Sequence, residues 1–316
     1  MSRNGKRFRF FMALAAIFAL VMLGTQEHLN LQQISLAAVS HNRLATNRLA
    51  TNRLATNRLA TNRLATNRLA TNRLATNALS SNRLEANAAS ADILATADGR
   101  EVYSYLIGCA LPEGVAIEAD VAGAPDSNPP ETNYTCAGGR CAFIGSLGLA
   151  PDWAEQKLDS KGERWVSACV FARVNFYETA VTISLRGDHP SLAVTDEEAA
   201  AYPLEEGAYY GNLFTHEEDP IDCNACRGRD KAAGAYGGLV LRECAAEDPN
   251  NPGRTYCGFN YAGDCGVNRT QSPSPYACRI FDPARGGYIS CHDTAGEGIW
   301  PKSKPYREVI TVYVSN

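Results

Sequence analysis

The sequence predicts an α+β protein, mainly β, in three parts: a hydrophobic N-terminal helix, a β-solenoid of short repeats, and a disulfide-rich α+β globular domain. Three observations predict this division. A basic segment and an apolar run open the chain, a pentapeptide repeats without interruption from Asn42, and none of the 11 cysteines precedes residue 109. The expected boundaries place the helix at residues 1–26, the repeats at 27–96 and the domain at 97–316.

The N-terminus has the pattern of an export signal. Arg3, Lys6, Arg7 and Arg9 precede an uninterrupted apolar run over residues 10–24. A basic segment followed by a short apolar one is typical of a secretory signal peptide, and an uncleaved N-terminal anchor is the alternative. The run is shorter than the about 20 apolar residues of a membrane span. Either outcome predicts export of the remaining chain to the cell-envelope surface, the periplasm or the extracellular space.

The repeat has a period of five residues. Seven perfect copies of Asn-Arg-Leu-Ala-Thr occupy residues 42–76, and degenerate copies continue to Thr96. Leucines five residues apart rotate by about 140° on an α-helix, so they form no apolar stripe there. In a continuous strand they would alternate between faces. A chain that turns by about 90° every five residues sends every leucine to a central axis, so the repeat predicts a solenoid.

This period, with a leucine at the centre of each unit, resembles the pentapeptide-repeat family over about residues 32–96. The resemblance implies a four-sided, right-handed β-helix with about 20 residues in each coil. The position two before the leucine is small in that family, but here it is asparagine, as at Asn42 and Asn47. Buried asparagines need hydrogen-bond partners, which amide ladders between stacked coils would supply. The alternative is a flexible low-complexity linker, although this segment contains no proline.

Charge is divided between the repeats and the domain. Residues 42–96 carry eight arginines against two acidic residues, a net charge of +6, whereas residues 97–316 carry 18 basic and 31 acidic residues, a net charge of −13. Columns of guanidinium groups would bind phosphate or carboxylate, so the expected partners are anionic polysaccharide, lipopolysaccharide or extracellular DNA. The alternative is that the arginines only keep the repeats soluble. The arginines of the perfect copies are Arg43, Arg48, Arg53, Arg58, Arg63, Arg68 and Arg73.

The cysteines predict disulfides, because export places them in an oxidising compartment. A first group comprises Cys109, Cys136, Cys141 and Cys169, and a second comprises Cys223, Cys226, Cys244, Cys257, Cys265, Cys278 and Cys291. The second group lies in a segment rich in Gly and Pro, which buries little core and needs such staples, each contributing about 2–4 kcal/mol. The spacing leaves the connectivity open. The odd count predicts five disulfides and one remaining thiol.

A zinc site is the alternative use of these residues. Cys223 and Cys226, in a Cys-x-x-Cys arrangement, would supply four ligands together with Cys291 and His292. Export favours oxidation over thiolate ligation, so we expect no metal and no cofactor. A thioredoxin-like use of the Cys-x-x-Cys lacks the strand-to-helix context which that chemistry needs.

Local patterns predict the main elements of the domain. Alternating or β-branched runs indicate strands, paired glycines between two such runs indicate a hairpin, and Asp, Ser or Thr before a helical pattern indicates an N-cap. The predicted elements are strands over residues 181–186 and 308–314, a hairpin over 134–144, a helix over 162–176 and a short helix capped by Thr195.

No motif assigns an activity. The weak catalytic candidates are Asp188, His189 and His292, where an imidazole has a carboxylate as its sequence neighbour. The glycines around Ser146 are misplaced for a nucleophile elbow. Residues 165–169 loosely resemble a segment of exported cysteine-rich proteins of myxobacteria that have no assigned activity, which supports location alone. We therefore expect an exported binding or structural protein, rather than an enzyme, that presents an acidic disulfide-stapled domain on a basic repeat stalk. The alternatives are a secreted hydrolase and a zinc-binding domain.

Overall fold

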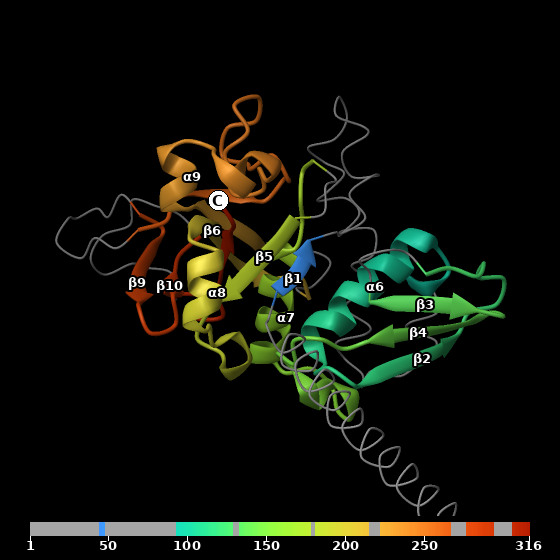
Figure 1. Ribbon diagram of the computed structural model, residues 1–316. Helices are drawn as coiled ribbons and strands as arrows, with labels where there is room; N and C mark the ends of the chain where they lie inside the picture. The colour runs from blue at the N-terminus through green and yellow to red at the C-terminus, as the bar shows by residue number, and fades with distance from the viewer. Residues whose placement is uncertain are drawn as a thin grey trace, which may run out of the picture. The chain divides into compact units, whose positions relative to one another are not determined.

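A six-stranded mixed sheet with the order β1-β5-β11-β6-β7-β8 organises the described part of the chain (Figure 1). All neighbouring strands are antiparallel except β7 and β8, which are parallel. The strands are β1 Leu44–Asn47, β5 Val181–Arg186, β6 Leu204–Asn212, β7 Asp222–Arg227, β8 Asn260–Asp264 and β11 Ile310–Val314. This computed structural model describes residues 44–47, 93–128, 133–177, 181–214, 222–266, 276–293 and 305–316, all within the unit Leu44–Asn316.

Helix α7, Ser160–Ala172, packs against strands β6 and β11 of this sheet. It begins where the Asp159 carboxylate accepts a hydrogen bond from the Gly162 amide at 2.6 Å, which satisfies one of the unpaired donors of the first turn. Its buried face, which includes Trp165 and Val166, joins the apolar side chains of β5 and β11 in the main core. The helix begins and ends a few residues earlier than predicted.

A three-stranded antiparallel sheet in the order β2-β4-β3 and helix α6 form a neighbouring layer (Figure 1). The bounds are α6 Ala97–Ala110, β2 Ala116–Asp120, β3 Tyr134–Ala137 and β4 Arg140–Ile144. The predicted hairpin is confirmed. Gly138 and Gly139 both have positive φ, 58° and 78°, as a two-residue turn between antiparallel strands requires.

The opposite face of the six-stranded sheet carries a smaller sheet, β9 Cys278–Asp282 paired with β10 Gly287–Cys291. Buried residues of β6, β7 and β9–β10 form a second, separate core cluster, which contains four cysteines. The remaining short helices of the described chain are α8 Asp196–Ala201 and α9 Arg229–Ala233, and the 3-10 helices are η2 Pro151–Ala154, η3 Pro190–Leu192 and η4 Gly237–Leu241. As predicted, the Thr195 hydroxyl caps α8 by accepting from the Glu198 amide at 3.2 Å.

The predicted fold class, with a hydrophobic N-terminal helix and a β-solenoid preceding the domain, is wrong. The structure has mixed sheets with few helices, and its described residues contain neither a β-solenoid nor a long apolar helix. Leu44–Asn47, which comprises the end of the first perfect copy of the repeat and the first residue of the second, is instead an edge strand antiparallel to β5, with Leu44 opposite Ser184. One edge of this strand therefore pairs with the domain, and it covers an edge that β5 would otherwise expose.

The end of the last repeat copy, residues 93–96, is the next described part of the chain. Ile93 and Leu94, from the last degenerate copy of the repeat, are buried in the main core, and Thr96 caps α6 through the Gly99 amide. The predicted export signal at residues 1–26 and the repeats over 48–92 lie outside the described residues. Among the residues that are described, no helix is both long and apolar enough to cross a membrane.

Candidate functional site

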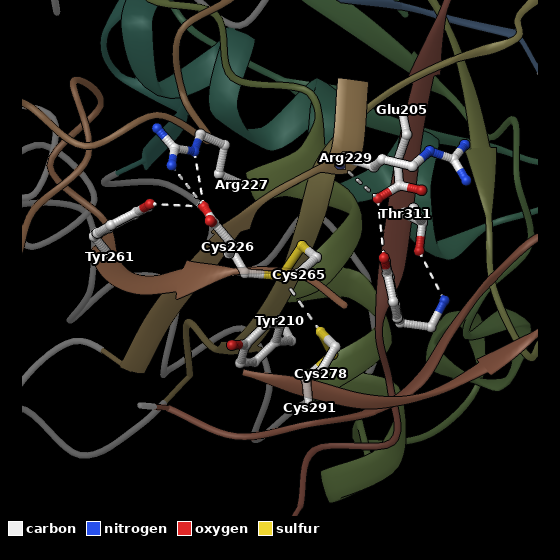
Figure 2. Close-up of a disulfide and its surroundings, with 12 residues drawn as sticks. Glu205, Tyr210, Cys226, Arg227, Arg229, Tyr261, Cys265, Cys278, Cys291 and Thr311 are labelled. Atoms are coloured by element: carbon white, nitrogen blue, oxygen red, sulfur yellow. Dashed lines mark hydrogen bonds and ion pairs between the residues drawn. A yellow bond between two sulfur atoms is a disulfide. The ribbon is translucent and has the colours of Figure 1, made fainter. Parts of the chain in front are cut away.

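Two disulfides lie in contact between the six-stranded sheet and the β9–β10 sheet (Figure 2). Cys226 of β7 is bonded to Cys265, which follows β8, and Cys278 at the start of β9 is bonded to Cys291 at the end of β10. The Sγ atoms of Cys226 and Cys278 are 3.3 Å apart. Disulfide sulfurs carry no hydrogen, so this is a direct sulfur–sulfur contact between two different disulfides.

The backbone around β7 and β8 brings these sulfurs together. The Cys265 amide donates to the Arg227 carbonyl at 2.7 Å, which places the end of β8 beside the end of β7. The Asp264 carboxylate accepts from the Arg227 Nε at 2.8 Å and from the Tyr261 hydroxyl at 3.2 Å (Figure 2). The chain then returns to β9 through the Ala277 amide, which donates to the Asp264 carbonyl at 3.2 Å. The sulfurs of Cys265 and Cys278 are thereby held within 4.8 Å of each other.

A pocket of about 460 Å³ opens onto one member of this sulfur cluster. Cys265 contributes to its lining, whereas Cys226, Cys278 and Cys291 are fully buried. The other lining residues are Glu205, Arg229, Ala232, Asp264, Gly266, Tyr276, Phe281 and Tyr288. Of the four cysteines, Cys265 is therefore the one that contributes to the pocket lining, and it is 5% exposed.

The Glu205 carboxylate forms a second wall of this pocket and is only 2% exposed. It accepts hydrogen bonds from the Tyr288 hydroxyl at 3.0 Å, the Arg229 amide at 3.1 Å and the Tyr313 hydroxyl at 3.4 Å. Burial, and then the Glu205 charge, raise the pKa of both tyrosines, which therefore stay protonated as donors. The Tyr288 amide in turn donates to the Thr311 hydroxyl at 3.0 Å, so this wall is fixed to β11.

A larger polar pocket, about 540 Å³, lies at the start of β7. Asp222 accepts from the Tyr306 hydroxyl at 2.8 Å and from the Asn224 amide group at 2.7 Å. Burial raises the pKa of the Asp222 carboxyl, although both hydrogen bonds and the nearby Arg164 oppose that shift. The remaining lining residues are Asp293, Pro305, Arg307 and Glu308. Carboxylates and guanidinium groups share this pocket, so it suits a polar ligand that carries both charges or several hydroxyls.

The catalytic candidates have structural roles. The Asp188 carboxylate forms an ion pair with Arg285 at 3.4 Å on the surface. The His189 Nδ1 accepts from the Ser191 amide at 3.1 Å and so caps η3, while its ring lies edge-on to Trp165. His292 is buried, and its carbonyl accepts from the Tyr210 hydroxyl at 2.5 Å. His189 lines a third pocket, of about 450 Å³, beside η2 and α7, so the two histidines belong to different parts of the fold.

The predicted disulfides are confirmed. Five bonds join Cys109–Cys169, Cys136–Cys141, Cys226–Cys265, Cys244–Cys257 and Cys278–Cys291. Cys223 is the remaining thiol and is buried. Five disulfides are compatible with an oxidising, exported environment. The seven arginines of the predicted anion-binding surface, Arg43 to Arg73, lie outside the described residues.

Strand β7 separates two of the four predicted zinc ligands, Cys223 and Cys226. Residues three apart in a strand point to opposite faces, so Cys223 lies in the main core whereas Cys226 lies in the second cluster. Within the described ranges, the group with the spacing of metal ligands is instead Cys226, Cys265 and Cys278, with sulfurs within 4.8 Å of one another. Cys265, which lies 39 residues after Cys226, thus takes the place of Cys223 in this group.

Sequence analysis missed the buried ionic groups of this region. The Glu206 carboxylate and the Arg242 Nε lie 2.7 Å apart, and both side chains are fully buried. Burial lowers the pKa of the Arg242 guanidinium, but the charges of Glu206 and Tyr209 and the hydrogen bonds to them together outweigh it, and the net shift is upward. The sequence feature that could have indicated these buried charges is the pair Glu205 and Glu206 within an otherwise apolar strand.

The geometry above stands without support from known relatives. A scan against protein-family models, a search of curated proteins and a search of solved structures each found no match for this chain.

Proposed function

We propose that this chain is an exported binding protein of the cell surface or the extracellular space. Its acidic domain is the recognition unit, and its arginine-rich repeat attracts anionic polymers. The observation that carries this proposal is the set of five disulfides, which engages ten of the 11 cysteines. Disulfides at this density are maintained in oxidising compartments, where thiol reductants do not reopen them.

Two further features support a binding role. The polar pocket at Arg164 and Asp222 offers carboxylate, guanidinium and phenol groups to a soluble ligand. The repeat places one arginine in every five residues, and guanidinium groups bind phosphate, sulfate and carboxylate through paired hydrogen bonds. Because Leu44–Asn47 pairs with β5, the first copy of the repeat begins directly at the domain. Anionic polysaccharide, lipopolysaccharide and extracellular DNA are the partners that fit this charge.

The location is tested on full-length protein produced in a Gram-negative host. We expect the protein in the periplasmic or extracellular fraction, with one thiol for each denatured, unreduced chain. Recovery from the cytoplasm with 11 free thiols would refute the proposal.

The anion-binding role is tested with the seven repeat arginines, Arg43 to Arg73, changed together to glutamine and, as the matched control, to lysine. Binding to heparin, lipopolysaccharide and double-stranded DNA is measured over a range of salt concentrations. We expect the glutamine variant to lose affinity and most of its salt dependence, because each lost cation releases about one counterion fewer. The lysine variant should keep the salt dependence and bind more weakly, since lysine lacks the paired donors of arginine. Equal binding by all three proteins would assign the affinity elsewhere.

A further inference from the structure

We infer that Cys265, Cys226, Cys278 and Cys291 form a thiol–disulfide exchange site, which an external thiolate enters through the 460 Å³ pocket. The site acts on thiols of small molecules or of cysteine-containing peptides. This activity is independent of the proposed binding function, because it needs only an oxidised chain and a thiol.

The arrangement of the four sulfurs carries the inference. The four cysteines follow one another in the order Cys265, Cys226, Cys278 and Cys291. A disulfide joins the first two and another joins the last two. The 3.3 Å contact between the Cys226 and Cys278 sulfurs connects the two disulfides (Figure 2). Exchange proceeds by attack of a thiolate on a disulfide sulfur, so it requires sulfurs in contact. Within the described residues, this is where sulfurs from two disulfides gather within 4.8 Å.

The surroundings differ at the two ends of this row. Cys265 lies in the pocket wall with Arg229, whose side chain is 72% exposed, and with the carboxylates of Glu205 and Asp264. Cys226, Cys278 and Cys291 are sealed from solvent. An external thiolate therefore reaches Cys265 first, and every later step takes place between protein sulfurs.

The exchange balances without an oxidant. The external thiolate attacks the Cys265 Sγ, forms a mixed disulfide and breaks the Cys226–Cys265 bond, so that the bonding electron pair leaves on Cys226. The Cys226 thiolate then attacks the Cys278 Sγ, forms a Cys226–Cys278 bond and breaks Cys278–Cys291. Cys291 departs as a thiolate and takes up one proton, which balances the proton that the external thiol lost on forming its thiolate. The number of disulfide bonds within the chain falls by one, and the mixed disulfide replaces it.

The sulfur contact favours this second step. The Cys226 thiolate lies 3.3 Å from the Cys278 Sγ, so the sulfur that it attacks is already in contact with it. The other disulfides serve as structural staples: Cys109–Cys169 joins α6 to α7, and Cys136–Cys141 lies across the β3–β4 hairpin.

The test uses oxidised full-length protein without any substitution. The protein is incubated with glutathione or with a short cysteine-containing peptide, quenched in acid, alkylated and mapped by mass spectrometry without reduction. We expect the adduct on Cys265, a new Cys226–Cys278 bond and an alkylated Cys291. Because Cys265 lines the pocket and its disulfide contacts a second one, the adduct on Cys265 should exceed that on any other disulfide cysteine by about tenfold. An adduct with either thiol supports the proposal, and the two arms show which class of thiol the pocket admits.

Two double variants separate the relay from general reduction. Cys278→Ser/Cys291→Ser removes the second disulfide, so the reaction should stop with an alkylated Cys226. Cys244→Ser/Cys257→Ser removes a disulfide of the same sequence separation, 13 residues, and should leave the relay unchanged. Equal adducts on all disulfides, or an alkylated Cys226 in the unsubstituted protein with Cys278–Cys291 intact, would overturn the proposal. So would a protein that yields no exchange products and, once reduced, holds one equivalent of zinc on Cys226, Cys265 and Cys278.

Discussion

Removing the Cys109–Cys169 disulfide should destabilise the protein about twice as much as removing Cys136–Cys141. The first bond joins residues 60 apart in sequence and connects α6 to α7. The second joins residues only five apart on paired strands of one hairpin. A disulfide restricts the unfolded chain more strongly when it closes a longer loop, so the two bonds differ in effect although both are buried.

Loop closure sets the expected magnitudes. For the chain-entropy relation, a 60-residue loop corresponds to about 4 kcal/mol and a five-residue loop to about 2 kcal/mol at 25 °C. The variants are Cys109→Ala/Cys169→Ala and Cys136→Ala/Cys141→Ala. Each variant loses two buried sulfurs, so the packing losses largely cancel in the comparison. The remaining difference is about 2 kcal/mol in favour of the longer loop.

Unfolding in guanidinium chloride, followed by circular dichroism, measures this difference. The midpoint should fall further for the Cys109/Cys169 variant, and the Tm values of the two variants should differ by about 4–8 °C. Both proteins must first show one thiol for each denatured chain, which establishes that the other four disulfides have formed. Equal destabilisation, or a larger loss for the hairpin variant, would refute the loop-closure reasoning.

Three other predictions concern buried ionisable groups. Glu206→Gln leaves the Arg242 charge buried without its counterion and should lower the free energy of unfolding in denaturant by about 3–5 kcal/mol. The double variant Glu206→Leu/Arg242→Met removes both charges and should lower it less. A double variant less stable than the single one would contradict this reasoning. Burial raises the pKa of Asp222 above 3.8, so its contribution to stability is present below that pH and is lost as the pH rises through the raised value. Relative to Asp222→Asn, the unsubstituted protein should therefore lose stability from about pH 4 upwards. Parallel stability curves for the two proteins would contradict this prediction. Burial, followed by the Asp222 charge, raises the pKa of the Cys223 thiol well above 9.0. An iodoacetamide time course at neutral pH should therefore show slow labelling of this thiol until the protein unfolds. Rapid labelling of the native protein would contradict the burial of Cys223.

Features governed by near neighbours in the sequence were predicted well. Strand 181–186 has the bounds expected from its alternation, and the caps at Asp159 and Thr195 start the helices that follow them. The hairpin formed at Gly138 and Gly139 because only a few backbone angles decide a two-residue turn. The odd cysteine count likewise predicted one unpaired thiol among otherwise complete disulfides.

The repeat was misread because period alone does not say what a strand pairs with. Five-residue spacing is consistent with a solenoid, but it also supplies short strands to any exposed sheet edge, and Leu44–Asn47 covers the edge of β5. The free energy gained when β1 pairs with the edge of β5 depends on the sequence of the domain, and the repeat pattern carries no information about that sequence. The solenoid would have aligned the repeat arginines on one surface, and without it they are not assigned to a common surface.

The local elements, and the expectations of export and of five disulfides, follow from residue types and their spacing along the chain. Tertiary structure alone decided the partners. It placed the C-terminal strand β11 between β5 and β6, put Cys223 and Cys226 on opposite faces of β7, and set the sulfurs of Cys226 and Cys278 in contact. The physical reason is that caps and turns depend on hydrogen bonds within a few residues. Disulfide pairing and strand order depend instead on loop closure and on packing between segments far apart in the chain.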